Sequence, residues 1–452
     1  MDQSVIPRPD AVADSVFGPG HLGELTQIVS FDLVDAALAA TRSVQQRVRA
    51  LPSRVVVYLL LAGALFEQIG YRQVWARLVS GLDGPAVATP STSALSQALR
   101  RVGPRALRAL FELLAGPAAG ALRWRGLLVC AVDGTSMFVP DSAANSAVFG
   151  RQTGRPDAAA GYPMLRLLAV VACGTRTVVD AVFGPYTTGE IAYAPKLFDC
   201  LKPGMLLLAD RNFAVAALIE KISATRAELL IRCKNGRALP SIKHLPDRSW
   251  LTRIGPVLVR VVDAEITVRC HHGPRRVGRY RLITTLTDEK RYPAAELVRL
   301  YHQRWEIETS YFELKSTLLG GRVLRARTPG GVDQEVYALL ITYQALRTAI
   351  ADTTLATGTP ADRASFTVAV NTARDQLIHA AAILADTTID LIGSIGRAVL
   401  ADPLPPRRTR TSPRVVKRAI SKHRAKGQID RNTYKTQITV HILPRLTPGQ
   451  DP

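Results

Sequence analysis

Cysteine is scarce in this chain, and its few copies are far apart. The 452 residues include five cysteines, none of them in a C-x-x-C pair. An odd, scattered set is typical of reduced thiols in a cytoplasmic protein and argues against a disulfide framework or a thiolate zinc site. We therefore expect most of the five to be core residues. They are Cys130, Cys173, Cys200, Cys233 and Cys270.

Long hydrophobic runs are also missing. The longest apolar stretch, from Val55 to Phe66, is too short to cross a bilayer and predicts a buried helix. The N-terminus lacks the charged and then apolar pattern of a signal peptide. We therefore expect no association with a membrane.

Acidic residues are outnumbered by basic ones. The chain has 37 Asp and Glu against 58 Lys and Arg, a formal net charge of +21. This excess favours a polyanionic partner, nucleic acid first and an anionic membrane surface second. Between residues 407 and 435, eleven Lys and Arg face one acid, Asp430, and so supply ten of the 21 net charges. This segment either adds salt-sensitive affinity for DNA or is a solvated tail without a specific partner.

The spacing of apolar residues divides the chain into four regions. Residues 1–116 have helical spacing and predict an N-terminal domain that could bind DNA ends. Residues 117–351 alternate strands and helices, which predicts a mixed α/β core with a β-rich insertion at about 235–281. Residues 352–402 are helical again, and residues 403–452 form the basic tail. Within the first region, Arg100 and Arg101 lie between two predicted helices, which either read DNA or pack in a bundle.

Two aspartates follow apolar strands in the predicted core. Gly126–Val132 is followed by Asp133, and Met205–Ala209 by Asp210. Buried strands end at a sheet edge, where ligand sites tend to form. A single aspartate after a strand is more often a turn or cap residue, so neither position predicts a site by itself.

Four polar residues recur at helical spacing after residue 300. They are Tyr301, Arg304, Glu308 and Lys315. At roughly 100° per residue, all four lie on one face of a single helix, with Glu306 and Glu313 on the opposite face. One carboxylate is thus flanked by a phenol, a guanidinium and an ammonium group, which can all bind phosphate.

Three carboxylates would be brought together if this helix packs on the sheet edge. Asp133, Asp210 and Glu308 would then repel one another and raise one another's pKa. Divalent cations remove this repulsion, and oxygen ligands select Mg²⁺ or Mn²⁺ over Zn²⁺. Two such ions, about 3.5–4 Å apart, could activate water or a 3′-hydroxyl and stabilise the leaving oxygen of a phosphodiester.

The four spaced residues resemble the Y-R-E-K signature of the IS4 family of bacterial insertion-sequence transposases. Asp133-Gly134-Thr135 and Asp210-Arg211-Asn212-Phe213 are similar to the segments with the family's first and second catalytic aspartates. Residues from about 20 to 116 resemble the N-terminal domain of one branch of the family. The likeness therefore covers most of the chain.

This resemblance implies an RNase H-like catalytic core with a β-rich insertion and a D-D-E triad that binds two Mg²⁺ ions. The implied catalytic residues and metal ligands are Asp133, Asp210 and Glu308. The implied contacts to the phosphates of the transposon end are Tyr301, Arg304 and Lys315. Arg211 is either a further phosphate contact or part of a structural ion pair. The family also implies cut-and-paste transposition of double-stranded DNA by a homodimer at the bacterial nucleoid.

Two other functions stay open on the sequence alone. A decayed copy would bind inverted repeats as a repressor without cutting them, and a nuclease would cut DNA without joining it. Formation of a DNA hairpin is also open, because Trp250 lies in the insertion, where related transposases place an aromatic residue that captures a flipped base.

Overall fold

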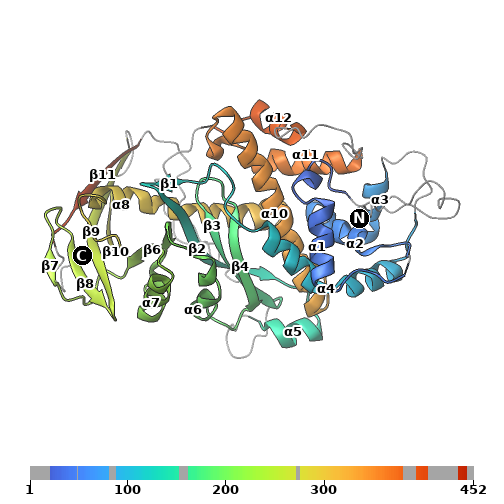
Figure 1. Cartoon of the computed structure of the whole chain (residues 1–452), viewed down its shortest axis with the longest axis horizontal. Helices are drawn as coiled ribbons and strands as arrows, with labels where there is room; N and C mark the ends of the chain where they lie inside the picture. Colours follow the sequence, from blue (N-terminus) through green and yellow to red (C-terminus); the bar gives the residue numbers. More distant parts are fainter. Residues whose placement is uncertain are drawn as a thin grey trace. The chain divides into compact units, whose positions relative to one another are not determined.

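The computed structural model describes residues 21–47, 49–80, 88–151, 161–270, 275–379, 393–405 and 436–444. Their helices and strands make a mixed α/β protein, as predicted (Figure 1). The chain divides into two compact units. The first unit comprises residues 1–124, 131–200 and 305–404, and the second comprises residues 125–130, 201–304 and 405–452. Each unit thus combines segments that are far apart in the sequence.

Four helices begin the first unit. They are α1 (Phe31–Ala40), α2 (Ser53–Leu65), α3 (Tyr71–Val79) and α4 (Thr92–Leu114). Every residue of α2 is buried, which confirms the buried helix predicted there. Both α2 and α4 pack against α10 (Pro329–Thr357), the long helix from the second half of the chain (Figure 1). The N-terminal helices therefore share a core with α10.

Helix α4 has a kink where the sequence predicts two separate helices. The side chain of Ser91 caps its start, and Gly103, with φ of 67°, interrupts it just before Pro104. A positive φ is costly for residues other than glycine, so Gly103 permits the kink. Arg101 donates to the carbonyl of Leu51 at 2.8 Å. This contact favours bundle packing over DNA reading for this arginine.

Three strands lie side by side in the order β4-β3-β2, and the first unit contains β3, β4 and the part of β2 from residue 131 onward. They are β2 (Leu127–Phe138), β3 (Met164–Ala172) and β4 (Val178–Pro185). β3 and β4 are antiparallel and form a hairpin. The sequence places the end of the first strand at Val132, but β2 continues to Phe138 with half-buried residues after the apolar run. Asp133 therefore lies within β2, and the predicted strand end is wrong there.

Shorter helices complete the first unit. They are α5 (Ala143–Phe149), α6 (Glu190–Tyr193), α11 (Phe366–Ile378) and α12 (Gly393–Ala401). α11 and α12 fall in the region 352–402 that the sequence predicts to be helical, of which residues 380–392 lie outside the described residues. None of the helices in the described ranges is both long and apolar enough for a membrane span.

The second unit is built on a sheet in the order β5-β6-β10-β9-β8-β7. Its strands are β5 (Met205–Ala209), β6 (Glu228–Cys233), β7 (Lys243–His244), β8 (Trp250–Ile254), β9 (Val257–Cys270) and β10 (Arg275–Thr284). β5 and β6 are parallel and are connected by α7 (Ala216–Ala224), whereas the other neighbours are antiparallel. β7 to β9 and most of β10 fall in the β-rich insertion that the sequence predicts at about 235–281.

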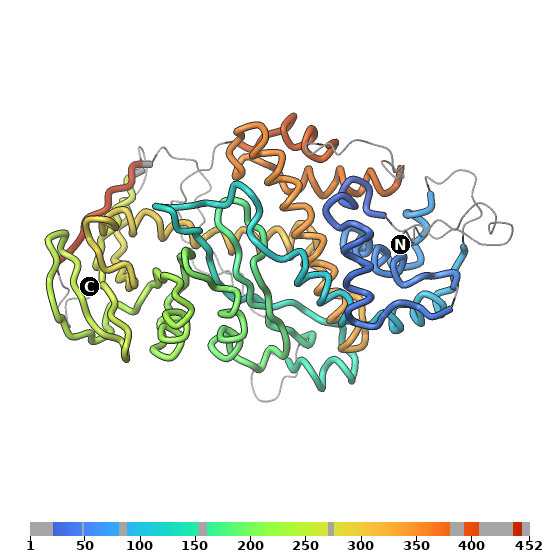
Figure 2. Tube along the Cα trace, viewed as in Figure 1, coloured from blue at the N-terminus to red at the C-terminus, as the bar shows by residue number. Residues whose placement is uncertain are grey.

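A strand from the end of the chain joins this sheet. β11 (Thr436–Ile442) is antiparallel to β9 and lies opposite residues 264–270, beyond the part of β9 that pairs with β8. Figure 2 shows this red segment along the yellow-green strand, although the two are far apart in sequence. β11 falls in the predicted basic tail. The cluster of basic residues at 407–435 lies outside the described residues.

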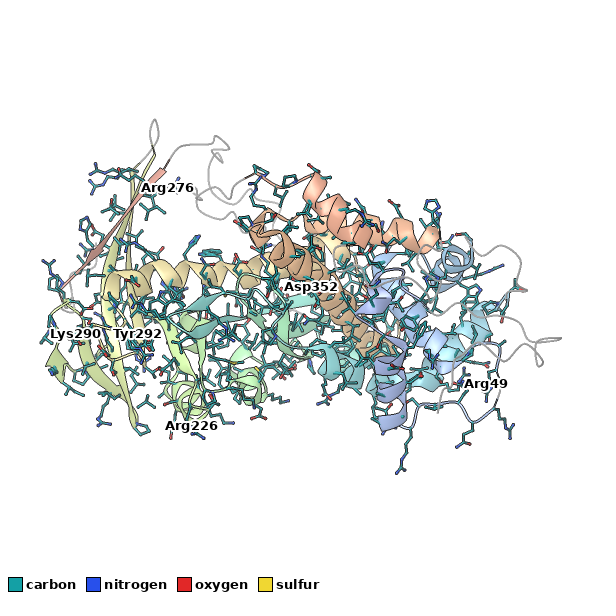
Figure 3. All side chains as sticks on the ribbon, turned by 45° about the horizontal axis from the view of Figure 1, so that its top comes forward. Arg49, Arg226, Arg276, Lys290, Tyr292 and Asp352 are labelled. Atoms are coloured by element: carbon teal, nitrogen blue, oxygen red, sulfur yellow. The ribbon has the colours of Figure 1, made fainter. Side chains whose placement is uncertain are left out.

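Buried ion pairs connect the strands and loops of the second unit. Arg260 is fully buried, pairs with Asp247 and donates to the carbonyl of Tyr292 at 2.7 Å (Tyr292 is labelled in Figure 3). Arg281 pairs with Asp263 through two hydrogen bonds of 2.7 and 3.0 Å. These pairs connect strands β9 and β10 to each other and to the loops around them.

Trp250 also belongs to this core. Its side chain is 1% exposed, and the guanidinium of Arg281 lies 6.0 Å from its ring. A side chain this well covered packs within the protein, so the structure favours a core role over base capture for Trp250.

Candidate active site

The segment with the Y-R-E-K spacing consists of three helical pieces rather than one helix. Tyr301–Arg304 is a 3₁₀ helix (η6), Trp305–Phe312 is α-helical (α9) and Glu313–Leu318 is a π-helix (η7). Because these pieces have different numbers of residues per turn, a single helical wheel of 100° per residue is wrong here. η6 belongs to the second unit, and α9 and η7 belong to the first.

In the first unit, α9 and η7 are attached to the strand that carries Asp133. The hydroxyl of Tyr311 donates to the backbone carbonyl of Asp133 at 2.6 Å. Nζ of Lys315 donates to Oγ1 of Thr135 at 3.0 Å. The half-buried carboxylate of Asp133 accepts from the backbone N–H of Gly134 at 2.8 Å. The structure thus brings the Asp-Gly-Thr segment together with the helix that carries Glu308 and Lys315.

Glu306 and Glu313, which the sequence placed on the face opposite Glu308, are buried. Glu306 and Glu313 are 3% and 6% exposed, whereas Glu308 is only half-buried. Arg176, in the turn between β3 and β4, donates to both buried glutamates, and Arg347 on α10 donates to Glu313 at 3.0 Å. The ion pairs hold the helix in place and keep Glu308 on its outer side.

Arg176 stays charged in this cluster. Burial alone would lower the pKa of its guanidinium, but the carboxylates of Glu313 and Glu306 raise that pKa above its ordinary value. A buried ion is tolerated only when its partners compensate for the lost water. The hydroxyl of Tyr343 adds a further hydrogen bond to Glu313 at 3.1 Å.

In the second unit, Asp210 directly follows β5, which confirms the predicted strand end. Its Oδ1 accepts from the backbone N–H of Asn212 at 2.8 Å and caps a short 3₁₀ turn, in which Arg211 is exposed. The hydroxyl of Tyr301 donates to the carbonyl of Ala209 at 3.0 Å. Burial raises the pKa of this hydroxyl, and the nearby Arg304 opposes the rise. Tyr301 is therefore a protonated donor that holds the backbone next to Asp210.

The three predicted carboxylates are divided between the two units. Asp133 and Glu308 belong to the first unit and Asp210 to the second. Among the residues that the structure describes, no three His, Cys, Asp or Glu side chains are grouped as a metal site requires. The metal-binding role of the three carboxylates stays a prediction. Their donors are all carboxylate oxygens, which fit Mg²⁺ or Mn²⁺.

Two residues near Asp133 were not identified from the sequence. Glu190 on α6 lies over Gly134, where an added Cβ would come 2.5 Å from its Oε1, and it pairs with Arg166 at 2.9 Å. Tyr311 lies three residues after Glu308 and so on the same helix face. That spacing is a signal from which Tyr311 could have been found, whereas the position of Glu190 depends on the folded arrangement of α6.

Comparison with known proteins identifies the class of the chain. Residues 124–345 match the family model described as transposase DDE domain. The chain is therefore a DDE-type transposase. Residues 19–112 match the model described as insertion element 4 transposase N-terminal. The chain belongs to the IS4 family of insertion-sequence transposases, as the spaced residues predict.

Relatives support this assignment. The chain is 29% identical over 349 residues to the transposase InsG for insertion sequence element IS4 of Escherichia coli K12, which covers 74% of this chain and 77% of InsG. It is also 29% identical over 173 residues to the putative transposase InsZ of the same organism, which covers 37% of this chain and 56% of InsZ. A solved structure of piggyBac transposase in a synaptic complex with hairpin DNA covers 85% of this chain and 86% of its own, with a TM-score of 0.42 and 9% identity.

The two family models and the likeness to InsG confirm the predicted function at the level of the family. The chain is a transposase of a bacterial insertion sequence and therefore acts on DNA. Domains of the DDE class generally use divalent metal ions. Asp133, Asp210 and Glu308 all fall within the residues that match the DDE domain.

Proposed function

We propose that this transposase cleaves DNA at the ends of its element and joins the freed ends to target DNA, with Asp133, Asp210 and Glu308 as its catalytic carboxylates. The observation that carries the proposal is the attachment of the Glu308 helix to the Asp133 strand through Tyr311 and Lys315. Asp210 stands at the end of β5. Asp210 thus has the strand-end position at which ligand sites tend to form, whereas Asp133 lies within β2 and is placed beside the Glu308 helix by the contact with Tyr311.

An RNase H-like core is part of this proposal. In the sheet, β2 lies next to β3, on the side away from β4. The first residues of β2 belong to the second unit and adjoin β5, since the N–H of Leu128 donates to the carbonyl of Gly204, just before β5, at 2.8 Å. An antiparallel hairpin followed by parallel strands β5 and β6 supports such a core. Strands β7 to β10 would then be the insertion that precedes the catalytic glutamate.

Asp133, Asp210 and Glu308 would hold two Mg²⁺ ions, for which Mn²⁺ can substitute. When bound, these ions would neutralise phosphodiester charge and make water or a 3′-hydroxyl a better nucleophile. The half-buried positions of Asp133, Asp210 and Glu308 would leave their carboxylates within reach of DNA. The buried pairs of Glu306 and Glu313 would keep the helix rigid while DNA binds.

Basic residues beside the carboxylates would hold the phosphates of the element end. Lys315 lies in the first unit near Thr135, and Arg304 and Arg211 lie in the second unit. Tyr301 would contact the DNA backbone beside Asp210. Charge-assisted hydrogen bonds to phosphate are strong and sequence-independent, so these residues would position the end while other segments recognise its sequence. The synaptic complex would contain two copies of the chain and would assemble at the nucleoid.

Cleavage of labelled DNA from the regions that flank the coding sequence tests this function. We expect the wild type to release ends and join them in Mg²⁺, and Asp133→Asn, Asp210→Asn and Glu308→Gln to bind the same DNA without cutting it. Glu220→Gln, at an exposed position on α7, is the control and keeps full activity. Unchanged cleavage by the three variants contradicts the proposal. Binding without scission by the wild type would favour an inactive DNA-binding protein, and cleavage without joining would favour a nuclease.

A further inference from the structure

A tyrosine hydroxyl joins two strands of the first unit beside the proposed active site. Tyr311 donates to the backbone carbonyl of Asp133 on β2 at 2.6 Å and accepts from the backbone N–H of Ala169 on β3 at 3.0 Å. Each residue has a single backbone N–H, so the proton of Ala169 goes to this side chain instead of to β2. At this point the neighbouring strands are connected through the hydroxyl.

The same side chain belongs to the helix that carries Glu308. Tyr311 lies three residues after Glu308 in α9, and residues at this spacing are neighbours on a helix surface. A movement of α9 relative to β2 would therefore break the hydrogen bond to Asp133. Tyr311 thus links the backbone of one proposed catalytic carboxylate directly to the helix that carries another.

The partners decide the direction of both hydrogen bonds. A backbone carbonyl only accepts and a backbone N–H only donates, so the hydroxyl of Tyr311 donates its proton to Asp133 and accepts from Ala169. Tyr311 is 8% exposed, so both bonds are formed inside the protein.

We propose that Tyr311 is a positioning residue that sets the distance between Asp133 and Glu308 and thereby the affinity of the site for divalent metal ions. The proposal rests on the function proposed above. Without the hydroxyl, the carbonyl of Asp133 and the N–H of Ala169 either lose a partner in a buried place or pair directly. Direct pairing would draw β2 and β3 together and move Asp133 relative to α9.

The experiment compares Tyr311→Phe with Tyr58→Phe in the full-length chain. Tyr58 on α2 is also buried, and its hydroxyl donates to the carbonyl of Val29 at 2.7 Å, so both variants lose the same group. Mn²⁺ affinity is measured by electron paramagnetic resonance without turnover, and the Mg²⁺ dependence of end cleavage is measured separately. Loss of a group that orients a metal ligand typically costs 10–100-fold in affinity or activity. We expect the Mn²⁺ affinity of Tyr311→Phe to fall within this range, its cleavage to be partly rescued by excess Mg²⁺, and its DNA binding to stay unchanged. Tyr58→Phe should keep the metal affinity of the wild type.

Wild-type Mn²⁺ affinity and Mg²⁺ dependence in Tyr311→Phe would overturn the proposal, even if that variant melts at a lower temperature. If Tyr311→Phe does not fold, 4-aminophenylalanine at position 311 decides instead, because its amino group can still donate to Asp133. Wild-type Mn²⁺ affinity then supports the proposal, and lost affinity in a folded protein contradicts it. Asp133→Asn is measured in parallel. If that variant binds Mn²⁺ and cleaves DNA normally, the failure lies with the proposed function and not with Tyr311.

Discussion

Arg176 and Glu306 form a buried ion pair in which Nε and Oε2 are 2.6 Å apart. The same guanidinium donates to Glu313 at 2.9 Å. Arg176 comes from the turn between β3 and β4, whereas the two glutamates come from the inner face of the helical segment that carries Glu308. This pair therefore connects the sheet of the first unit to that helical segment.

Replacement of Arg176 by methionine should destabilise the protein strongly. Methionine keeps the apolar stem but leaves Glu306 and Glu313 without this cation in a buried place. Removal of one partner of a buried pair costs about 3–5 kcal/mol. We expect a loss of this size in the free energy of unfolding, measured by urea denaturation.

The control for Arg176→Met is Arg108→Met. Arg108 pairs with Glu112 on the surface of α4 at 2.8 Å, with side chains 65% and 56% exposed. Exposed pairs contribute about 0–1 kcal/mol, so this variant should unfold almost as the wild type does. If the free energy of unfolding falls equally in both variants, the buried pair of Arg176 contributes no more to stability than the exposed pair of Arg108.

A methyl group at Gly134 should disturb the neighbourhood of Asp133. An added Cβ would lie 2.5 Å from Oε1 of Glu190, so Gly134→Ala must displace the Glu190 side chain or strand β2. We expect Gly134→Ala to reduce end cleavage and the double variant Gly134→Ala, Glu190→Ala to recover part of it. Cleavage rates of the two single variants and the double variant form a double-mutant cycle. Additive effects would contradict a steric conflict between the two positions.

Regular patterns made part of the fold and site predictable. The apolar run from Val55 predicted the buried helix α2, and the strand before Asp210 ends where the sequence indicates. Glu306 and Glu313 were predicted on the face opposite Glu308, and they are buried there. These features depend on local periodicity, which a single sequence contains.

Features that depend on tertiary contacts could not be predicted in the same way. The 3₁₀, α and π pieces around Glu308 have no distinct local pattern, and their boundaries follow the contacts of each piece. Arg176 is remote in sequence from Glu306 and Glu313, and its φ of 61° arises in a tight turn. β11 pairs with β9 across a long stretch of chain. Such pairings become visible only when the chain is folded.

Lys315 should contribute one phosphate contact to the binding of element ends. Release of counterions gives a slope of log affinity against log salt of about −0.9 per phosphate neutralised on duplex DNA. We expect Lys315→Gln to weaken end binding at low salt and to reduce the magnitude of the slope by about 1, as measured by titration at several NaCl concentrations. Lys221→Gln, at an exposed position on α7, is the charge-matched control. A wild-type slope for Lys315→Gln would exclude a direct phosphate contact.

Buried His21 should make the stability of the protein depend on pH below neutrality. Burial lowers its pKa from 6.5 to about 4. Its Nδ1 accepts from the backbone N–H of Gly23 at 3.2 Å, a bond that requires an unprotonated Nδ1. The unfolded chain takes up this proton more readily than the folded chain does. The contribution of neutral His21 is therefore complete above pH 6.5 and is lost as the pH falls towards 4.

This loss amounts to about 3 kcal/mol, since one pKa unit corresponds to about 1.4 kcal/mol. Between pH 7 and pH 4.5 we expect the free energy of unfolding of His21→Asn to fall less than that of the wild type, by about 2.5 kcal/mol. His379→Asn, at an exposed position, should keep the wild-type pH dependence. If the free energy of unfolding depends on pH in the same way for the wild type and His21→Asn, His21 has the same pKa in the folded protein and in the unfolded chain. That result would contradict a buried, neutral His21.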